Sequence, residues 1–286
     1  SFLGSPTLNI SGSGTRILDG PTLTFNNANF SGGSLEVKSG TFNATGTTTV
    51  SSSTSFSTTG GTFNLATLNV NSASILSIPA GTISPSGLTT ISGAASIDAS
   101  GGIFTPTTLT LNNGTLTGSS NVTISGLLTW NDGDMLGTGT TFTNGGIDFG
   151  GGSGSRTVDR NLINSGTNSW DLTGSIDGTG TLTHQSGTLT ITDGFFLDPG
   201  FVNNGAIIID ASGNLIGFSD VQNTGTVQID NGTLRIDGNG TNTGTFTVAS
   251  GADLLFRNDY TFSSGGVSGL GTLEIDGSDF DLFGGT

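Results

Sequence analysis

Asn203-Asn204-Gly205-Ala206-Ile207-Ile208-Ile209-Asp210 begins a stretch, Val202 to Phe256, that repeats one short unit three times. The other two copies begin at Asn223-Thr224-Gly225-Thr226-Val227-Gln228-Ile229-Asp230 and at Asn242-Thr243-Gly244-Thr245-Phe246-Thr247-Val248-Ala249. Their glycines lie 20 and 19 residues apart, and alternate residues after each glycine are apolar. Alternation is typical of a strand with one buried and one wet face. We therefore predict that the following pairs point inward: Ile207 and Ile209, Val227 and Ile229, Phe246 and Val248.

A second strand follows a further glycine within each unit. It is seen at Gly232-Thr233-Leu234-Arg235-Ile236 and, one residue out of step, at Gly251 to Phe256. A fixed period near 20 residues, with glycine at the corners and no helical pattern, is typical of a parallel β-solenoid. We predict an all-β, single-stranded parallel β-helix without helices, of about 14 coils of roughly 20 residues and about 65 to 70 Å in length.

The same period runs through the N-terminal part of the chain. Glycine followed by a short apolar strand recurs at Gly20, Gly40, Gly61, Gly81 and Gly102, with spacings of 20 or 21 residues. Phe42, Phe63 and Ile83 take the same place after successive glycines, so we expect them to stack as a ladder in a dry interior. We predict one domain over residues 1–286, more regular from about 110 to 277, with parallel strands over residues 20–277.

A polar column accompanies the glycines in the second half. It occupies positions 144, 164, 185, 203, 223, 242 and 263, which hold Asn, Asn, Gln, Asn, Asn, Asn and Ser, each two residues before a glycine. Asn at a corner tolerates left-handed backbone angles, and stacked amides can bond the coils above and below. We interpret this column as a structural device.

Composition narrows the possible functions. Six Lys plus Arg against 21 Asp plus Glu give a formal net charge of −15, which disfavours nucleic acid as a partner. No apolar run reaches the length of a membrane span, so we expect no membrane insertion. The chain has no cysteine and therefore no disulfide, which is compatible with export as an unfolded chain.

The tandem Asn-x-Gly-Thr units, with the phrase Ile124-Ser125-Gly126-Leu127-Leu128-Thr129-Trp130, resemble the β-helical repeats of large bacterial surface proteins. These are the filamentous haemagglutinin and autotransporter-passenger proteins. The resemblance covers residues 110 to 277 well and the N-terminal third loosely. It implies an exported, extended adhesin, matrix component or fibre, located outside the cell or on the bacterial cell surface.

Catalytic candidates are sparse. His184 is the only histidine, and we expect it at a corner or exposed to solvent rather than acting as a base. Asp132 and Asp134 form the densest acidic pair, but they lie without a cationic partner at a glycine-rich corner. The basic residues are scattered along the chain: Arg16, Lys38, Arg156, Arg160, Arg235 and Arg257. We predict no catalytic residue, no bound cofactor and no enzymatic activity.

Calcium is the one metal considered. Gly151 to Asp159 is similar to the glycine-rich nonapeptide of calcium-binding β-rolls, but Arg156 stands where a ligand aspartate is required. Asp210 and Asp230, predicted to stack one coil apart, remain weak calcium candidates, since nearby carbonyl groups could complete the coordination.

Aromatic and threonine residues suggest further alternatives. Trp130 and Trp170 share strand parity with Leu128 and Leu172, so we expect both inside rather than as sugar-stacking platforms. Threonine rows such as Thr47 to Thr49 and Thr188 to Thr192 suggest an ice-binding face, but the rows shift from coil to coil. Thr is also simply a favoured outward strand residue.

The leading hypothesis is a non-catalytic structural protein, the shaft or repeating subunit of an extracellular fibre, adhesin or biofilm-matrix filament. Ser1 to Ile10 and Asp279 to Thr286 carry no polar cap, and apolar alternation continues at Phe280, Leu282 and Phe283. Two arrangements would cover such ends: the chain is an excerpt from a longer solenoid, or the last coil of one copy docks on the first coil of the next. We hypothesise the second, head-to-tail assembly through the terminal coils. Cell-surface glycans or other matrix components are further expected partners. The alternatives are a carbohydrate-binding or polysaccharide-cleaving β-helix and, third, an ice-binding protein.

Overall fold

The computed structural model describes residues 6–150, 154–277 and 280–282. The described chain is all-β, and its parallel strands stack as a β-solenoid of about 13 turns, close to the predicted number. The chain divides into two compact units, residues 1–144 and 145–286, and each unit is described by itself. A single domain over residues 1–286 stays a prediction. Among the described residues, no helix has the length and apolar character that crossing a membrane requires.

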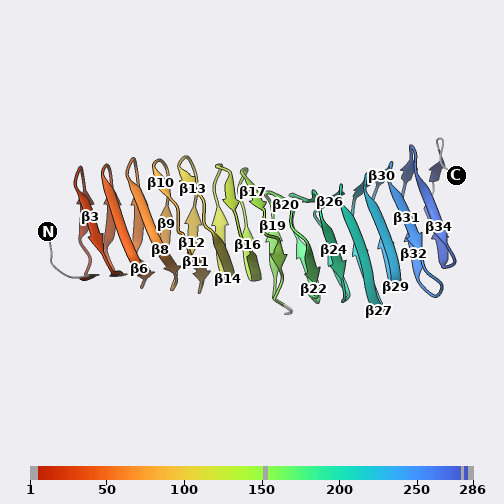
Figure 1. Ribbon diagram of the computed structural model, residues 1–286, viewed down its shortest axis with the longest axis horizontal. Coiled ribbons are helices and arrows are strands. Elements are labelled where there is room, and N and C mark those ends of the chain that lie inside the picture. The colour runs from red at the N-terminus through yellow and green to blue at the C-terminus, as the bar shows by residue number, and fades with distance from the viewer. Residues whose placement is uncertain (1–5, 151–153, 278–279, 283–286) are drawn as a thin grey trace. The chain divides into compact units, whose positions relative to one another are not determined.

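The first unit contains strands β1 to β17, which Figure 1 shows stacked in chain order. Their bounds are β1 (Thr7–Ser11), β2 (Thr15–Leu18), β3 (Thr22–Phe25), β4 (Asn27–Ser31), β5 (Ser34–Val37), β6 (Thr41–Ser51), β7 (Ser55–Thr58), β8 (Thr62–Val70), β9 (Ile75–Ser77), β10 (Thr82–Ile83), β11 (Leu88–Ser92), β12 (Ser96–Asp98), β13 (Ile103–Phe104), β14 (Thr108–Thr117), β15 (Val122–Ile124), β16 (Leu128–Met135) and β17 (Thr140–Thr143).

The second unit contains strands β18 to β36. Their bounds are β18 (Ile147–Asp148), β19 (Arg156–Val158), β20 (Asn161–Asn164), β21 (Asn168–Trp170), β22 (Gly174–Asp177), β23 (Thr181–His184), β24 (Thr188–Ile191), β25 (Phe195–Leu197), β26 (Gly200–Asn203), β27 (Ala206–Phe218), β28 (Val221–Asn223), β29 (Thr226–Ile236), β30 (Gly240–Asn242), β31 (Thr245–Val248), β32 (Asp253–Phe256), β33 (Tyr260–Phe262), β34 (Gly266–Gly269), β35 (Thr272–Ile275) and β36 (Phe280–Leu282).

Each coil contributes three strand segments, so that β1, β2 and β3 pair in parallel with β4, β5 and β6 of the next coil. Long strands such as β6 bend through a corner, and its two halves pair on two faces with β3 and β4. The paired residues Thr7 and Asn27 are 20 positions apart, and Thr41 and Thr62 are 21 apart. The predicted coil length is therefore confirmed at these pairs.

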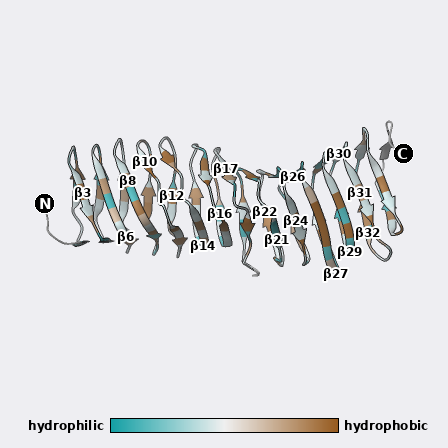
Figure 2. Ribbon diagram, viewed as in Figure 1, coloured by the Kyte–Doolittle hydropathy of each residue, from teal (hydrophilic) through white to brown (hydrophobic). Residues whose placement is uncertain are grey.

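The predicted apolar ladder forms in the first unit. Phe42 pairs with Phe63, and Phe63 with Ile83, and all three side chains are buried. The Phe42 and Phe63 ring centroids lie 5.6 Å apart, within the range of favourable aromatic pairs. Figure 2 shows apolar and polar residues mixed along the strands, because alternate side chains face the interior.

The register predicted for the second unit is confirmed. Ile207 pairs with Val227 and Val227 with Phe246, while Ile209 pairs with Ile229 and Ile229 with Val248. All six side chains are buried. At the chain ends, β1 extends the parallel strands beyond the predicted start at residue 20, whereas Ser1 to Ser5, Asp279 and Phe283 lie outside the described residues.

Candidate functional site

The two calcium candidates do not meet. A register shift follows Ile209, so Asp210 lies opposite Asn231 instead of Asp230, and the predicted stacking of the two carboxylates is wrong. The Asn231 amide donates to Asp210 Oδ1 at 2.6 Å, and the Gln228 amide donates to Asp230 Oδ1 at 2.8 Å. Within the part of the chain that the structure describes, no three His, Cys, Asp or Glu side chains are grouped to hold a metal ion.

Chelation is therefore expected to leave the melting temperature unchanged. Asp210 is exposed and Asp230 is partly exposed, each accepts a hydrogen bond from an amide, and they do not lie opposite each other, so water screens their charges and no ion is needed. Thermal unfolding measured with and without a chelator checks this. A fall in the melting temperature that added calcium restores would reveal a stabilising metal site.

Asp132 and Asp134, the densest acidic pair of the sequence, lie close to a glycine in the structure. They lie on β16 opposite Asn112 and Thr115 of β14, and the Asp132 carboxylate accepts a hydrogen bond from the Gly133 amide at 2.7 Å. Trp130, on the same strand, is buried as expected, and its indole N–H donates to the Gly133 carbonyl oxygen at 3.0 Å. Trp170 is buried too, so the structure offers neither indole as a sugar platform.

The Arg156 side chain is buried. Its guanidinium donates hydrogen bonds and cannot serve as an oxygen ligand for calcium. Its guanidinium donates to the Phe149 carbonyl at 2.6 Å and the Gly154 carbonyl at 2.9 Å. Arg16 does the same in the first unit, donating to the carbonyl groups of Gly14 and Ser11. The phrases Gly12-Ser13-Gly14-Thr15-Arg16-Ile17-Leu18-Asp19 and Gly152-Ser153-Gly154-Ser155-Arg156-Thr157-Val158-Asp159 share this pattern, 140 residues apart. Of the nonapeptide, residues 151–153 lie outside the described residues.

The threonine rows considered for an ice-binding face are interrupted in both units. In the second unit Thr188 and Thr190 pair with Ala206 and Ile208, so the row is broken there. In the first unit the outward column stays in register but mixes residue types, with Asn29, Thr49, Asn69, Thr90, Thr110 and Thr129 in successive coils. Thr49 stands between Asn29 and Asn69, so the threonine row that contains it is interrupted in the first unit too.

A buried polar column runs through the second unit, and its membership differs from the prediction. Paired strands place Asn164, His184, Asn203, Asn223 and Asn242 in successive coils, all buried. The Asn203 amide donates to Asn223 Oδ1, and the Asn223 amide to Asn242 Oδ1, each at 2.8 Å. The predicted amide ladder is confirmed at these residues. His184 takes the place assigned to Gln185, Phe262 the place assigned to Ser263, and Asn144 is exposed.

His184 is buried, so the expectation of solvent exposure is wrong, whereas the alternative expectation of a corner fits its place as the last residue of β23. Its Nε2 lies 3.2 Å from the carbonyl oxygens of Gly187 and Ala206, and its Nδ1 lies 3.4 Å from Asn164 Nδ2. This environment assigns the neutral tautomer with the proton on Nε2, because Nδ1 must accept from the amide. Burial lowers the pKa of His184 from its ordinary 6.5, with the hydrogen bonds to Gly187 and Ala206 opposing the shift. The imidazole therefore acts as a neutral link in the column.

Stability is expected to fall as the pH is lowered through this region. Between 6.5 and the lower pKa of the folded state, the unfolded chain binds a proton at His184 that the folded chain does not, so protonation favours unfolding. Melting temperatures measured from about pH 7 to 5.5 check this, since most carboxylates titrate below that range. His184→Asn keeps a neutral polar link and should flatten the profile. A profile that is equally steep in the variant would assign the effect to other groups.

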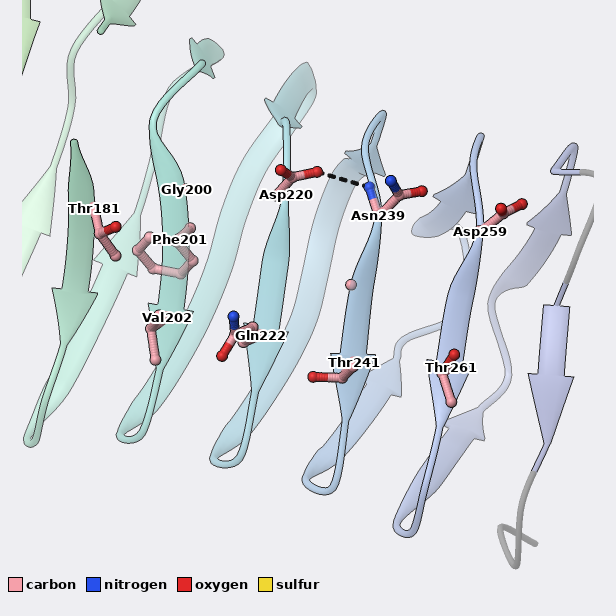
Figure 3. A pocket seen from close by; sticks show the side chains of 11 residues that line it. Thr181, Gly200, Phe201, Val202, Asp220, Gln222, Asn239, Thr241, Asp259 and Thr261 are labelled. Carbon is pink, nitrogen blue, oxygen red and sulfur yellow. Dashed lines mark hydrogen bonds between the residues drawn. The ribbon is translucent and has the colours of Figure 1, made fainter. Parts of the chain in front are cut away.

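The described surface is hollowed by a groove of about 460 Å³ on the outward side of strands β23, β26, β28, β30 and β33. Two rows of side chains border it, and Figure 3 shows them crossing successive strands. We call Gly200, Asp220, Asn239 and Asp259 the acidic row, and Val202, Gln222, Thr241 and Thr261 the hydroxyl row. Backbone pairing aligns both rows across the strands. Thr181, Phe201 and Gly240 complete the lining.

Two glycines shape the groove. A Cβ at Gly200 would meet only Thr181 Oγ1, at 3.9 Å, so the acidic row is open there. Gly240 lies in the floor, where a Cβ would come within 2.4 Å of the Tyr260 ring. That ring is buried, and its hydroxyl donates to the Thr241 carbonyl oxygen at 3.3 Å. Gly240 thus takes an inward-facing position, between buried Val221 and Tyr260, where the absence of a side chain makes room for the Tyr260 ring.

The groove offers polar groups of two kinds. Asp220 and Asp259 are exposed carboxylates, and Asp220 Oδ1 accepts a hydrogen bond from the backbone N–H of Asn239 at 2.8 Å. Gln222, Thr241 and Thr261 add an uncharged amide and two hydroxyls. The arrangement is suited to binding a polar ligand. The sequence interpretation missed the groove, although a glycine at strand position 200 is a signal of open space there.

Comparison with known proteins finds no match: no protein-family model, no curated protein and no solved structure is similar to this chain. Its function must therefore follow from its own residues and geometry.

Proposed function

We propose that this chain is a non-catalytic structural protein, the shaft or repeating subunit of an extracellular bacterial fibre, adhesin or matrix filament that assembles head-to-tail. The observation that carries the proposal is the exposure of inward-facing residues in the first and last described coils. Leu23, which pairs with buried Phe42, is 37% exposed. Leu273 and Ile275, which pair with buried Leu254 and Phe256, are 42% and 43% exposed.

These residues belong to strands with one unpaired edge in the described chain. An open strand edge together with exposed interior side chains is a template for another strand of the same kind. A contact between a first coil and a last coil is heterologous and does not close, so it produces a filament and not a ring. The stacked coils of one subunit would continue in the next.

Electron microscopy of the concentrated protein tests assembly. The expected result is filaments with an axial repeat near the ~62 Å given by about 13 turns at ~4.8 Å each. Leu23→Lys and Leu273→Lys place a charge in the contact and should abolish filaments. Leu88→Lys is the matched control, because Leu88 is 45% exposed on an outward face. Protein that stays monomeric at high concentration, or filaments that survive both end substitutions, would contradict the proposal.

The absence of enzymatic activity is part of the proposal and has its own test. Incubation with pectin, other glycans and peptides is expected to release no product. Release that is lost in Asp132→Asn, Asp134→Asn, Asp220→Asn or Asp259→Asn would support the polysaccharide-cleaving alternative instead.

A further inference from the structure

The groove of the second unit has a charge pattern that selects its ligand. This unit carries 16 Asp plus Glu and 4 Arg, whereas the first carries 5 Asp plus Glu and 2 basic residues. The acidic row adds two carboxylates at the rim, and the lining contains no Lys or Arg. An anionic polymer would be repelled, whereas a cationic one would form ion pairs with the carboxylates in place of the hydrogen bonds that a neutral one would offer. A ligand with regularly placed positive charges fits best.

The hydroxyl row specifies the rest of the ligand. Gln222, Thr241 and Thr261 present donors and acceptors without charge, one from each successive strand. Such a row matches a chain rich in hydroxyl groups that crosses the strands. The carboxylates of Asp220 and Asp259 belong to coils two apart, so they are separated by about 9.5 Å along the groove.

This spacing separates two kinds of cationic polymer. In an extended peptide at ~3.3 Å per residue, about 9.5 Å corresponds to three residues, whose side chains point to opposite faces. In an extended β-linked chain of amino sugars, alternate units face the same way and two units span about that distance. The saccharide can therefore present an ammonium group to each carboxylate while its hydroxyl groups face the opposite row.

We propose that this groove binds a polysaccharide bearing free amino groups, laid across strands β23 to β33. Its ammonium groups lie at Asp220 and Asp259, and its hydroxyl groups bond Gln222, Thr241 and Thr261. Gly200 leaves room for the chain to enter between the rows. This site goes beyond the structural role proposed above and does not depend on filament assembly.

Direct binding of soluble glucosamine oligomers to the full chain, measured calorimetrically at low salt, tests the proposal. Binding is expected to weaken as salt is raised. Fully N-acetylated oligomers of equal length should bind about tenfold more weakly, because two exposed ion pairs are lost. Asp220→Asn and Asp259→Asn should each weaken binding about 2- to 5-fold. Gly200→Gln should block the groove, since its side chain would enter open space.

Matched variants keep the test specific. Asp210→Asn removes the same charge from another exposed position and should leave affinity unchanged. Gly14→Gln adds the same side chain at a glycine in the first unit that also has open space around it. Thermal unfolding confirms that each variant is folded.

Three results would overturn the proposal. Equal affinity for acetylated oligomers would show that the amino groups are not recognised. An equal loss in Asp210→Asn and Asp220→Asn would indicate unspecific attraction to an acidic protein. Tighter binding of oligolysine with the same dependence on Asp220 and Asp259 would make the groove a site for cationic peptides.

Discussion

Phe246→Asp is expected to destabilise the protein by more than ~3 kcal/mol or to prevent folding. Phe246 is fully buried, and its ring centroid lies 5.9 Å from that of Phe256 and 6.2 Å from that of Phe262. The substitution removes these contacts and places a carboxylate among apolar side chains, where no described basic residue is paired with it in the neighbouring coils. Chemical denaturation, or the yield of soluble protein where folding fails, measures the effect.

Thr247→Asp is the matched control, because Thr247 is the next residue of the same strand and is exposed. Its cost is expected to lie within about 0.5 kcal/mol, as for most surface substitutions. If Thr247→Asp proved the more damaging change, the strand would be in the opposite register, with every side chain of β31 on the other face.

Asn223→Leu is expected to cost about 2 to 4 kcal/mol although it makes the interior more apolar. Asn223 accepts from the Asn203 amide and donates to Asn242 Oδ1, so its loss leaves a buried donor and a buried acceptor without this partner. An unsatisfied buried polar group costs about 1 to 3 kcal/mol. The free energy of unfolding from denaturant titration gives the measurement.

Asn204→Leu provides the comparison, since Asn204 is exposed and its side chain bonds only other exposed groups, on Gln185 and Thr224. It should cost less than about 1 kcal/mol. Combining Asn203→Leu with Asn223→Leu should cost less than the two single changes together, because both partners of one bond are then apolar. Additive costs would show that the column is not coupled.

The repeat period alone was sufficient to predict the fold and the inward faces. When glycines recur every 19 to 21 residues, strands of successive coils meet at equivalent positions, and alternation then separates inside from outside. For this reason Ile207, Val227 and Phe246 were correctly predicted to align, and Trp130 and Trp170 to be buried. These features depend on the spacing of residues along the chain, which can be read directly from the sequence.

Only the tertiary structure could show the features that depend on a one-residue shift in strand register or on residues from several coils. His184 stands three residues before Gly187, whereas its neighbours in the column stand two residues before a glycine. Strand pairing, and not glycine spacing, aligns His184 with Asn164 and Asn203. The shift after Ile209 likewise separates Asp210 from Asp230. The groove is lined by residues in or next to five strands, from Thr181 to Thr261 in the sequence, that lie together on one surface. Such sites arise only from stacking, because residues about 20 positions apart become neighbours through backbone pairing and not through any local signal.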